Sequence, residues 1–253
     1  MEIKQKDDAR EAASRLVKNV QHAELQGNDA AWCDAATALV AHVQTQVGGC
    51  LSRKWQLTAE SALVIPTLVT VLSHRAATPI LKLHAVEALR LSVCTNDANQ
   101  HIACSAVAAL VDTIATPPPP PPLSEGPKAA AVAKGIAEQL RDAALESLSE
   151  LVFMHRPSQD AALAANIINH LMLFINCAGP HSANPTATQA RALRVLANLT
   201  RSNVMTPASA RHSIMMIMRL FHPCSFLLCL GSDLLVRWKQ PPRRVLRAPC
   251  RRS

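Results

Sequence analysis

Apolar residues recur every three to four positions along most of this 253-residue chain, with charged and polar residues between them. This period is typical of amphipathic helices rather than strands. Residues 1–25 and 30–47 each follow it, and Gly27 separates the two segments. We therefore predict an N-terminal helix within residues 1–27 and a second helix that Asp29 caps.

After residue 50, a shorter apolar segment precedes a longer one three times, which indicates an internal repeat. The longer segments share a small residue at the first place and a leucine at the fifth; they are AVEALRLS (85–92), ALESLSEL (144–151) and ALRVLANL (192–199). The shorter segments are VIPTLVTVL (64–72), AVAALVDTI (106–114) and NIINHLMLF (166–174). Their central leucines Leu68, Leu110 and Leu171 occupy one place, and the first two lie 42 residues apart.

A proline-rich insertion at residues 116–135 lengthens the next step of the repeat to 61 residues. Proline removes a backbone donor and clashes with the preceding turn, so the run Pro117 to Pro122 is predicted to leave the helix as a loop. We favour a tolerated loop insertion, because loop closure entropy grows slowly with length. The alternative is a polyproline II ligand for profilin or for an SH3, WW or EVH1 domain.

The alternation resembles the armadillo-repeat family over residues 28–221. The lead-ins at residues 99–103 and 158–162 are similar to the first helix of an armadillo unit, and residues 192–199 end in the family's Leu-x-Asn-Leu. The resemblance implies an all-α, right-handed α-solenoid. Ser105 and Ala165 stand where the family has a glycine before the short helix, which leaves the related HEAT type open.

Stacking of the units follows from the apolar pattern itself. Each helix pair has more than one apolar stripe, so one unit cannot cover its own surface and must pack against its neighbours. Leu89, Leu148 and Leu196 are expected in the shared core. Small residues beside them, such as Ala88 and Ser147, would let the helices approach closely.

The resemblance also implies that the longer helices line a groove for an extended peptide or a helix of another protein. The predicted groove residues are Glu87, Leu91, Glu146, Glu150, Arg194 and Asn198. Nuclear-import receptors of this family hold basic peptides with Trp and Asn at these places. Only Asn198 agrees with that pattern, so import-cargo binding is disfavoured. The acidic groove residues and Arg191, Arg194 and Arg201 predict opposite charge at the two ends of the groove.

Charge and composition change this picture only at the end of the chain. The net charge is +8, yet seven of the 26 basic residues follow residue 236, after all 18 acidic ones. The repeat pattern ends at residue 221, and residues 222–253 are first apolar and then basic. Such a segment also fits a truncated or alternatively spliced end, or an incorrect gene model. This tail offers an alternative function, binding of nucleic acid or an anionic membrane surface. Its basic residues are Arg237, Lys239, Arg243, Arg244, Arg247, Arg251 and Arg252.

Enzymatic chemistry finds little support in the sequence. No Walker loop, dinucleotide fingerprint, GxSxG elbow or HExxH motif is present, so we expect a non-enzymatic scaffold or adaptor without a cofactor. The eight cysteines form no CxxC pair, and no secretory signal or membrane span is evident, which predicts reduced thiols and a cytoplasmic or nuclear location. Two groups of cysteine and histidine residues lie close together in the sequence, but their spacing matches no common metal site, so we expect them to have structural roles and to bind no metal. They are Cys94, His101 and Cys104, and His170, Cys177 and His181.

Overall fold

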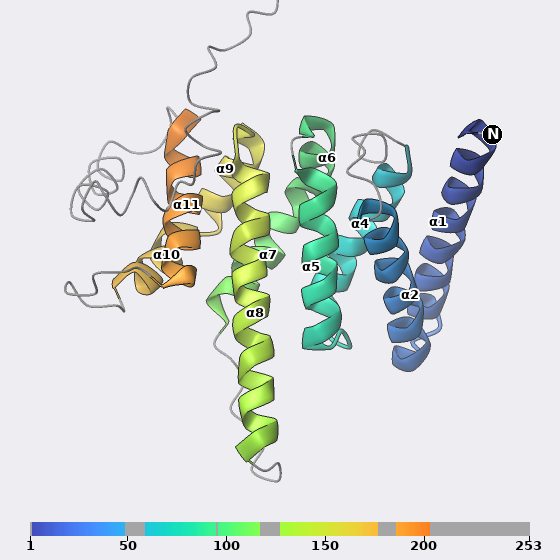
Figure 1. Ribbon diagram of the computed structural model, residues 1–253, viewed down its shortest axis with the longest axis horizontal. Helices are drawn as coiled ribbons and strands as arrows, with labels where there is room; N and C mark the ends of the chain where they lie inside the picture. Colours follow the sequence, from blue (N-terminus) through green and yellow to red (C-terminus); the bar gives the residue numbers. More distant parts are fainter. Residues whose placement is uncertain (1, 49–58, 95, 117–126, 177–185, 203–253) are drawn as a thin grey trace, which may run out of the picture. The chain divides into compact units, whose positions relative to one another are not determined.

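The computed structural model describes residues 2–48, 59–94, 96–116, 127–176 and 186–202, which belong to one compact unit within Met1–Thr206. Every regular element in these ranges is a helix, and they contain no β-strand (Figure 1). The all-α class predicted from the apolar period is confirmed. The predicted segment 222–253, with its basic tail, lies outside the described residues.

The first two helices are α1 (Glu2–Leu25) and α2 (Asp29–Gly48). Gly27 ends α1 in the left-handed region, at φ 63°, where a side chain would be strained. The cap of α2 differs from the prediction, because Asn28 Oδ1 accepts a hydrogen bond from the Ala31 N–H at 3.1 Å. The expectation that Asp29 caps α2 was therefore wrong. Asp29 is the first helical residue, where its charge still favours the helix N-terminus.

The remaining helices coincide with the segments of the repeat. The shorter segments lie in α4 (Ala59–Ser73), α7 (Ala106–Ala115) and α10 (Ile167–Asn176). The longer segments lie in α5 (Pro79–Val93), α8 (Pro127–Val152) and α11 (Ala187–Ser202). The two lead-ins form α6 (Asp97–Ile102) and α9 (Arg156–Ala164), and a 3₁₀ turn (Ala103–Ser105) joins α6 to α7.

The end of the predicted insertion is helical. Helix α8 begins at Pro127, so residues 127–135 extend it toward its N-terminus. Proline is well tolerated at a first helical position, and the alanines and lysines that follow are strong helix formers. The proline run itself, Pro117 to Pro122, lies outside the described residues.

Contacts between the helices form two rows. One row contains the helices with the longer segments and α2, with contacts between α2 and α5, α5 and α8, and α8 and α11. The other row contains contacts between α1 and α4, α4 and α7, and α7 and α10. The short helices α6 and α9 also contact each other. Each unit of the repeat thus contacts the same kinds of helix in the next one.

The core lies between these rows. Leu89, Leu148 and Leu196 have no exposed surface. The central leucines of the shorter segments are buried to the same degree, as are Ala88 and Ser147. Burial of each leucine contributes roughly 1.5–3 kcal/mol, so the equivalent leucines supply a repeated share of the folding free energy.

The turn before the short helix is built differently in the two complete units. Asn166, directly before α10, has φ 59°, which asparagine tolerates better than most residues. Ser105, before α7, stays in the right-handed helical region at φ −63°. The left-handed conformation that a glycine would favour therefore occurs at Asn166. This is one residue after Ala165, which the sequence pattern aligns with the glycine of the family.

No helix among the described ranges combines the length and the apolar character needed to cross a bilayer.

Candidate functional site

Charged side chains form a ladder across the neighbouring helices α5, α8 and α11. Arg191 on α11 donates from Nε to Glu146 Oε1 at 2.6 Å and from Nη1 to Asp142 Oδ2 at 3.0 Å. Arg194 donates from Nη2 to Glu150 Oε1 at 2.8 Å. On the other side, Arg90 Nε of α5 lies 3.8 Å from Glu146 Oε2. The charge ladder is defined here as Arg90, Asp142, Glu146, Glu150, Arg191 and Arg194.

Helical spacing explains why these groups meet. Asp142, Glu146 and Glu150 are four residues apart on α8 and share one face, while Arg191 and Arg194 are three apart on α11. Thr188 adds a hydrogen bond to Asp142 at 2.7 Å. Most ladder side chains are partly buried, and Glu150 is the most covered, with 14% of its side chain exposed. Such a network holds charges more firmly than isolated surface pairs do.

The predicted separation of charge along the groove is wrong for the residues that the structure describes. Arg191 and Arg194 lie directly against Glu146 and Glu150 instead of forming a positive end opposite a negative one. Arg201 is helical, but its side chain lies outside the described part of the chain. The carboxylates of Asp142, Glu146 and Glu150 on α8 are therefore largely neutralised by arginines of the same protein.

Glu87 and Leu91, the predicted groove residues on α5, lie outside the ladder. Glu87 has 43% of its side chain exposed, and its Oε2 lies 3.6 Å from His84 Nδ1. The Gln44 amide on α2 donates to the same oxygen at 3.5 Å. Leu91 is half-buried. This part of the surface keeps an accessible carboxylate beside an apolar side chain.

Asn198 is turned into the contact between α11 and α8. It is 5% exposed, and its Nδ2 donates to Ser149 O at 3.0 Å and to Ser149 Oγ at 2.9 Å. Both amide hydrogens thus have acceptors inside the protein. The structure assigns Asn198 to helix packing, although the residue type matches the family pattern.

The sequence reasoning missed the carboxamides that cap the end of α8. The last four carbonyls of a helix have no partner within it. Three of these carbonyls of α8 accept hydrogen bonds from side chains of other helices. Asn198 donates to Ser149 O at 3.0 Å, Gln100 Nε2 to Glu150 O at 2.7 Å, and Gln159 Nε2 to Val152 O at 2.9 Å. These side chains come from α11, α6 and α9, so the end of α8 joins three other helices.

One of these bonds recurs at equivalent places in successive units. Gln100 and Gln159 are each the fourth residue after a helix N-cap, and Gln159 Nε2 also donates to Asn198 O at 3.1 Å. Glu150 and Asn198, whose carbonyls accept these bonds, occupy the same place in the aligned longer segments. Glutamine occupies the same position in both lead-ins, and this coincidence in the sequence could have indicated the shared hydrogen bond.

A pair of histidines lies where α6 and α9 meet. His155 is the N-cap of α9, and its Nδ1 accepts the Ser158 N–H at 3.4 Å and lies 2.8 Å from Ser158 Oγ. The ring centroids of His101 and His155 are 6.0 Å apart in an edge-to-face arrangement. Burial lowers the pKa of His155, the neighbouring His101 lowers it further, and Asp97 raises it in part.

We expect His155 to make the free energy of unfolding fall below neutral pH. Because its native pKa lies under the usual 6.5, the unfolded chain binds more protons between these two values, and stability rises with pH there. The loss is complete below the native pKa. His155→Asn keeps a capping side chain but removes the titrating imidazole. The variant should therefore show a smaller difference between the free energies of unfolding measured in urea at about pH 5 and at about pH 7.5. An unchanged pH difference in the variant would contradict this account, and the exposed His22→Asn serves as the matched control.

The remaining candidate sites lie partly or wholly outside the described residues. No group of three or more His, Cys, Asp or Glu side chains is arranged to hold a metal ion in these ranges. Cys177 and His181 lie outside them, as do the proline run and the basic tail. The polyproline and phosphate-binding roles stay predictions.

The chain matches no protein-family model, no curated protein and no solved structure. The resemblance to armadillo repeats therefore rests on the residues of this chain alone.

Proposed function

We propose that residues 28–221 form an armadillo-type α-solenoid and that the protein is a non-enzymatic scaffold of the cytoplasm or nucleus. Its partner, an extended peptide or a helix of another protein, would lie along the surface of α5, α8 and α11. The observation that carries this proposal is the recurring hydrogen bond from Gln100 and Gln159, in the lead-in helices, to the longer helix of the same unit. A bond repeated at equivalent places is expected of units that share one internal structure, and the bond from Gln159 to Val152 O also ties its unit to the longer helix of the preceding one.

The charge ladder supports a preformed binding surface. It joins α5, α8 and α11 through side chains that are partly withdrawn from water. A partner that binds to helices already held together does not pay the entropy of ordering them. The ladder also uses most of the acidic groups on α8. A partner would therefore be selected by shape and by the groups that stay accessible, which are Glu87 and Leu91 outside the ladder and the half-exposed Arg194 within it.

Site-specific photo-crosslinking tests where a partner binds. A benzophenone amino acid would replace Glu87 or Arg194 in the full chain, and the exposed residues Glu24 and Asp8 on α1 would serve as control positions. We expect the same protein to be joined at both positions on the longer helices and at neither control position. Adducts at the α1 positions alone, or at none of the four positions, would contradict the proposed surface.

A charge reversal provides the second arm of this experiment. Glu87→Lys changes an accessible carboxylate that lies outside the ladder, whereas reversal of Glu146 or Glu150 would also break contacts with Arg90, Arg191 or Arg194. We expect Glu87→Lys to weaken binding of the crosslinked partner by about tenfold with an unchanged melting temperature. Glu24→Lys, with the same change of charge on α1, should leave the affinity unchanged.

A further inference from the structure

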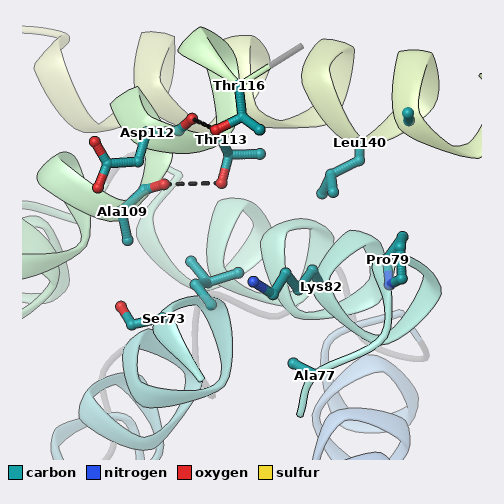
Figure 2. Close-up of a pocket in the computed structure, with 11 residues that line it drawn as sticks. Ser73, Ala77, Pro79, Lys82, Ala109, Asp112, Thr113, Thr116 and Leu140 are labelled. Atoms are coloured by element: carbon teal, nitrogen blue, oxygen red, sulfur yellow. Dashed lines mark hydrogen bonds between the residues drawn. The ribbon is translucent and has the colours of Figure 1, made fainter. Parts of the chain in front are cut away.

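A cavity of about 370 Å³ lies away from the charge ladder, where α4, α5, α7 and α8 meet (Figure 2). This size falls within the roughly 300–1,000 Å³ typical of small-molecule sites. Its apolar lining comes from all four helices and the turn before α5: Leu72, Ala77, Pro79, Ala109, Ala137 and Leu140. None of the ladder residues lines it, so a ligand here would act independently of the proposed protein-binding surface.

Lys82 is the cation of this cavity. In Figure 2 its side chain extends into the space between the labelled residues, while the carboxylate of Asp112 points away from it at the edge. No described acidic residue forms an ion pair with Lys82, in contrast to the arginines of the ladder. Lys82 is half-buried, and an ammonium group that is partly withdrawn from water attracts an anion more strongly than a fully solvated one does.

The other polar groups of the lining are already engaged as donors. Ser73 Oγ donates to Val69 O at 3.3 Å, Thr113 Oγ1 to Ala109 O at 2.8 Å, and Thr116 Oγ1 to Asp112 O at 2.7 Å. Each hydroxyl thus uses its hydrogen on its own helix. Within this lining, the Lys82 ammonium is the side-chain donor that remains for a ligand.

We propose that the cavity binds an aliphatic monocarboxylate, with its carboxylate on Lys82 and its hydrocarbon chain against Leu72 and Leu140. One available donor selects one anionic group, and the apolar lining selects an alkyl body. The carboxylate of Asp112 at the edge disfavours a second negative charge on the ligand. A partly apolar cavity with one cation and one carboxylate at its edge is therefore expected to favour a monocarboxylate over phosphates and dicarboxylates.

Three ligands of matched length test the proposal: octanoate, octanol and octylammonium, titrated into the full chain by calorimetry. We expect saturable binding of octanoate, binding of octanol weaker by about tenfold or more, and no binding of octylammonium. Absence of saturable octanoate binding, or equal affinity for the three ligands, would overturn the proposal.

Two substitutions separate the charge from the cavity itself. Lys82→Met keeps the apolar stem and should reduce the affinity for octanoate to that for octanol, without a change in the affinity for octanol. Asp112→Asn should strengthen octanoate binding severalfold, because it removes the nearby negative charge. Melting curves establish that both variants are folded. Unchanged octanoate affinity in a folded Lys82→Met variant would refute the assigned role of Lys82.

Discussion

Leu148→Asp is expected to unfold the protein. Leu148 has no exposed surface, and its helix α8 contacts α5, α7 and α11. The substitution removes a buried apolar side chain and places a carboxylate in the same apolar surroundings, so both effects lower the free energy of unfolding. Their sum should exceed about 4 kcal/mol, a large part of the stability of a typical domain. Circular dichroism and urea unfolding would measure the loss.

The matched control for this change lies on the same helix. Ala133 is exposed, and Ala133→Asp adds the same carboxylate where water solvates it. The control should shift the free energy of unfolding by no more than about 0.5 kcal/mol. A folded, soluble Leu148→Asp protein with an unchanged melting temperature would refute the placement of Leu148 in the shared core.

Gln159→Leu is expected to cost about 2–4 kcal/mol, because it leaves the buried carbonyl of Val152 without its donor and removes a second hydrogen bond to Asn198 O. Gln159 has no exposed surface, and its Nε2 bonds both Val152 O and Asn198 O. Val152 is the last residue of α8, so no amide within that helix can replace the lost donor. Leucine has nearly the same volume, which limits the contribution of a cavity. Chemical unfolding with two independent probes would measure the change.

Gln100→Leu is the internal comparison for this prediction. Gln100 is the equivalent residue of the preceding unit, and its Nε2 donates to one carbonyl, Glu150 O. We expect a smaller loss of about 1–3 kcal/mol. Gln139→Leu on the exposed part of α8 should be nearly neutral. An equal loss of unfolding free energy in Gln100→Leu and Gln159→Leu would show that the number of hydrogen bonds each glutamine donates does not set its contribution to stability.

The sequence by itself determined the helices, their repetition and the leucines of the core. These features depend on local chemistry: apolar residues at a spacing of three to four residues produce one buried stripe on a helix, whatever its neighbours are. Leu89, Leu148 and Leu196 were predicted on that ground and are fully buried. The ends of helices were less certain, because capping depends on one hydrogen bond, which Asn28 makes instead of Asp29.

The tertiary structure alone decided which polar side chains face one another. Arg191 and Glu146 are 45 residues apart in the chain, and Gln159 and Asn198 are 39 apart. Their contact depends on how far one helix is displaced along its neighbour and how it is rotated. Residue periodicity within one helix contains no information on that displacement. A shift of a single turn, about 5.4 Å, would exchange every partner in the ladder, so the sequence predicted the charges correctly and their separation wrongly.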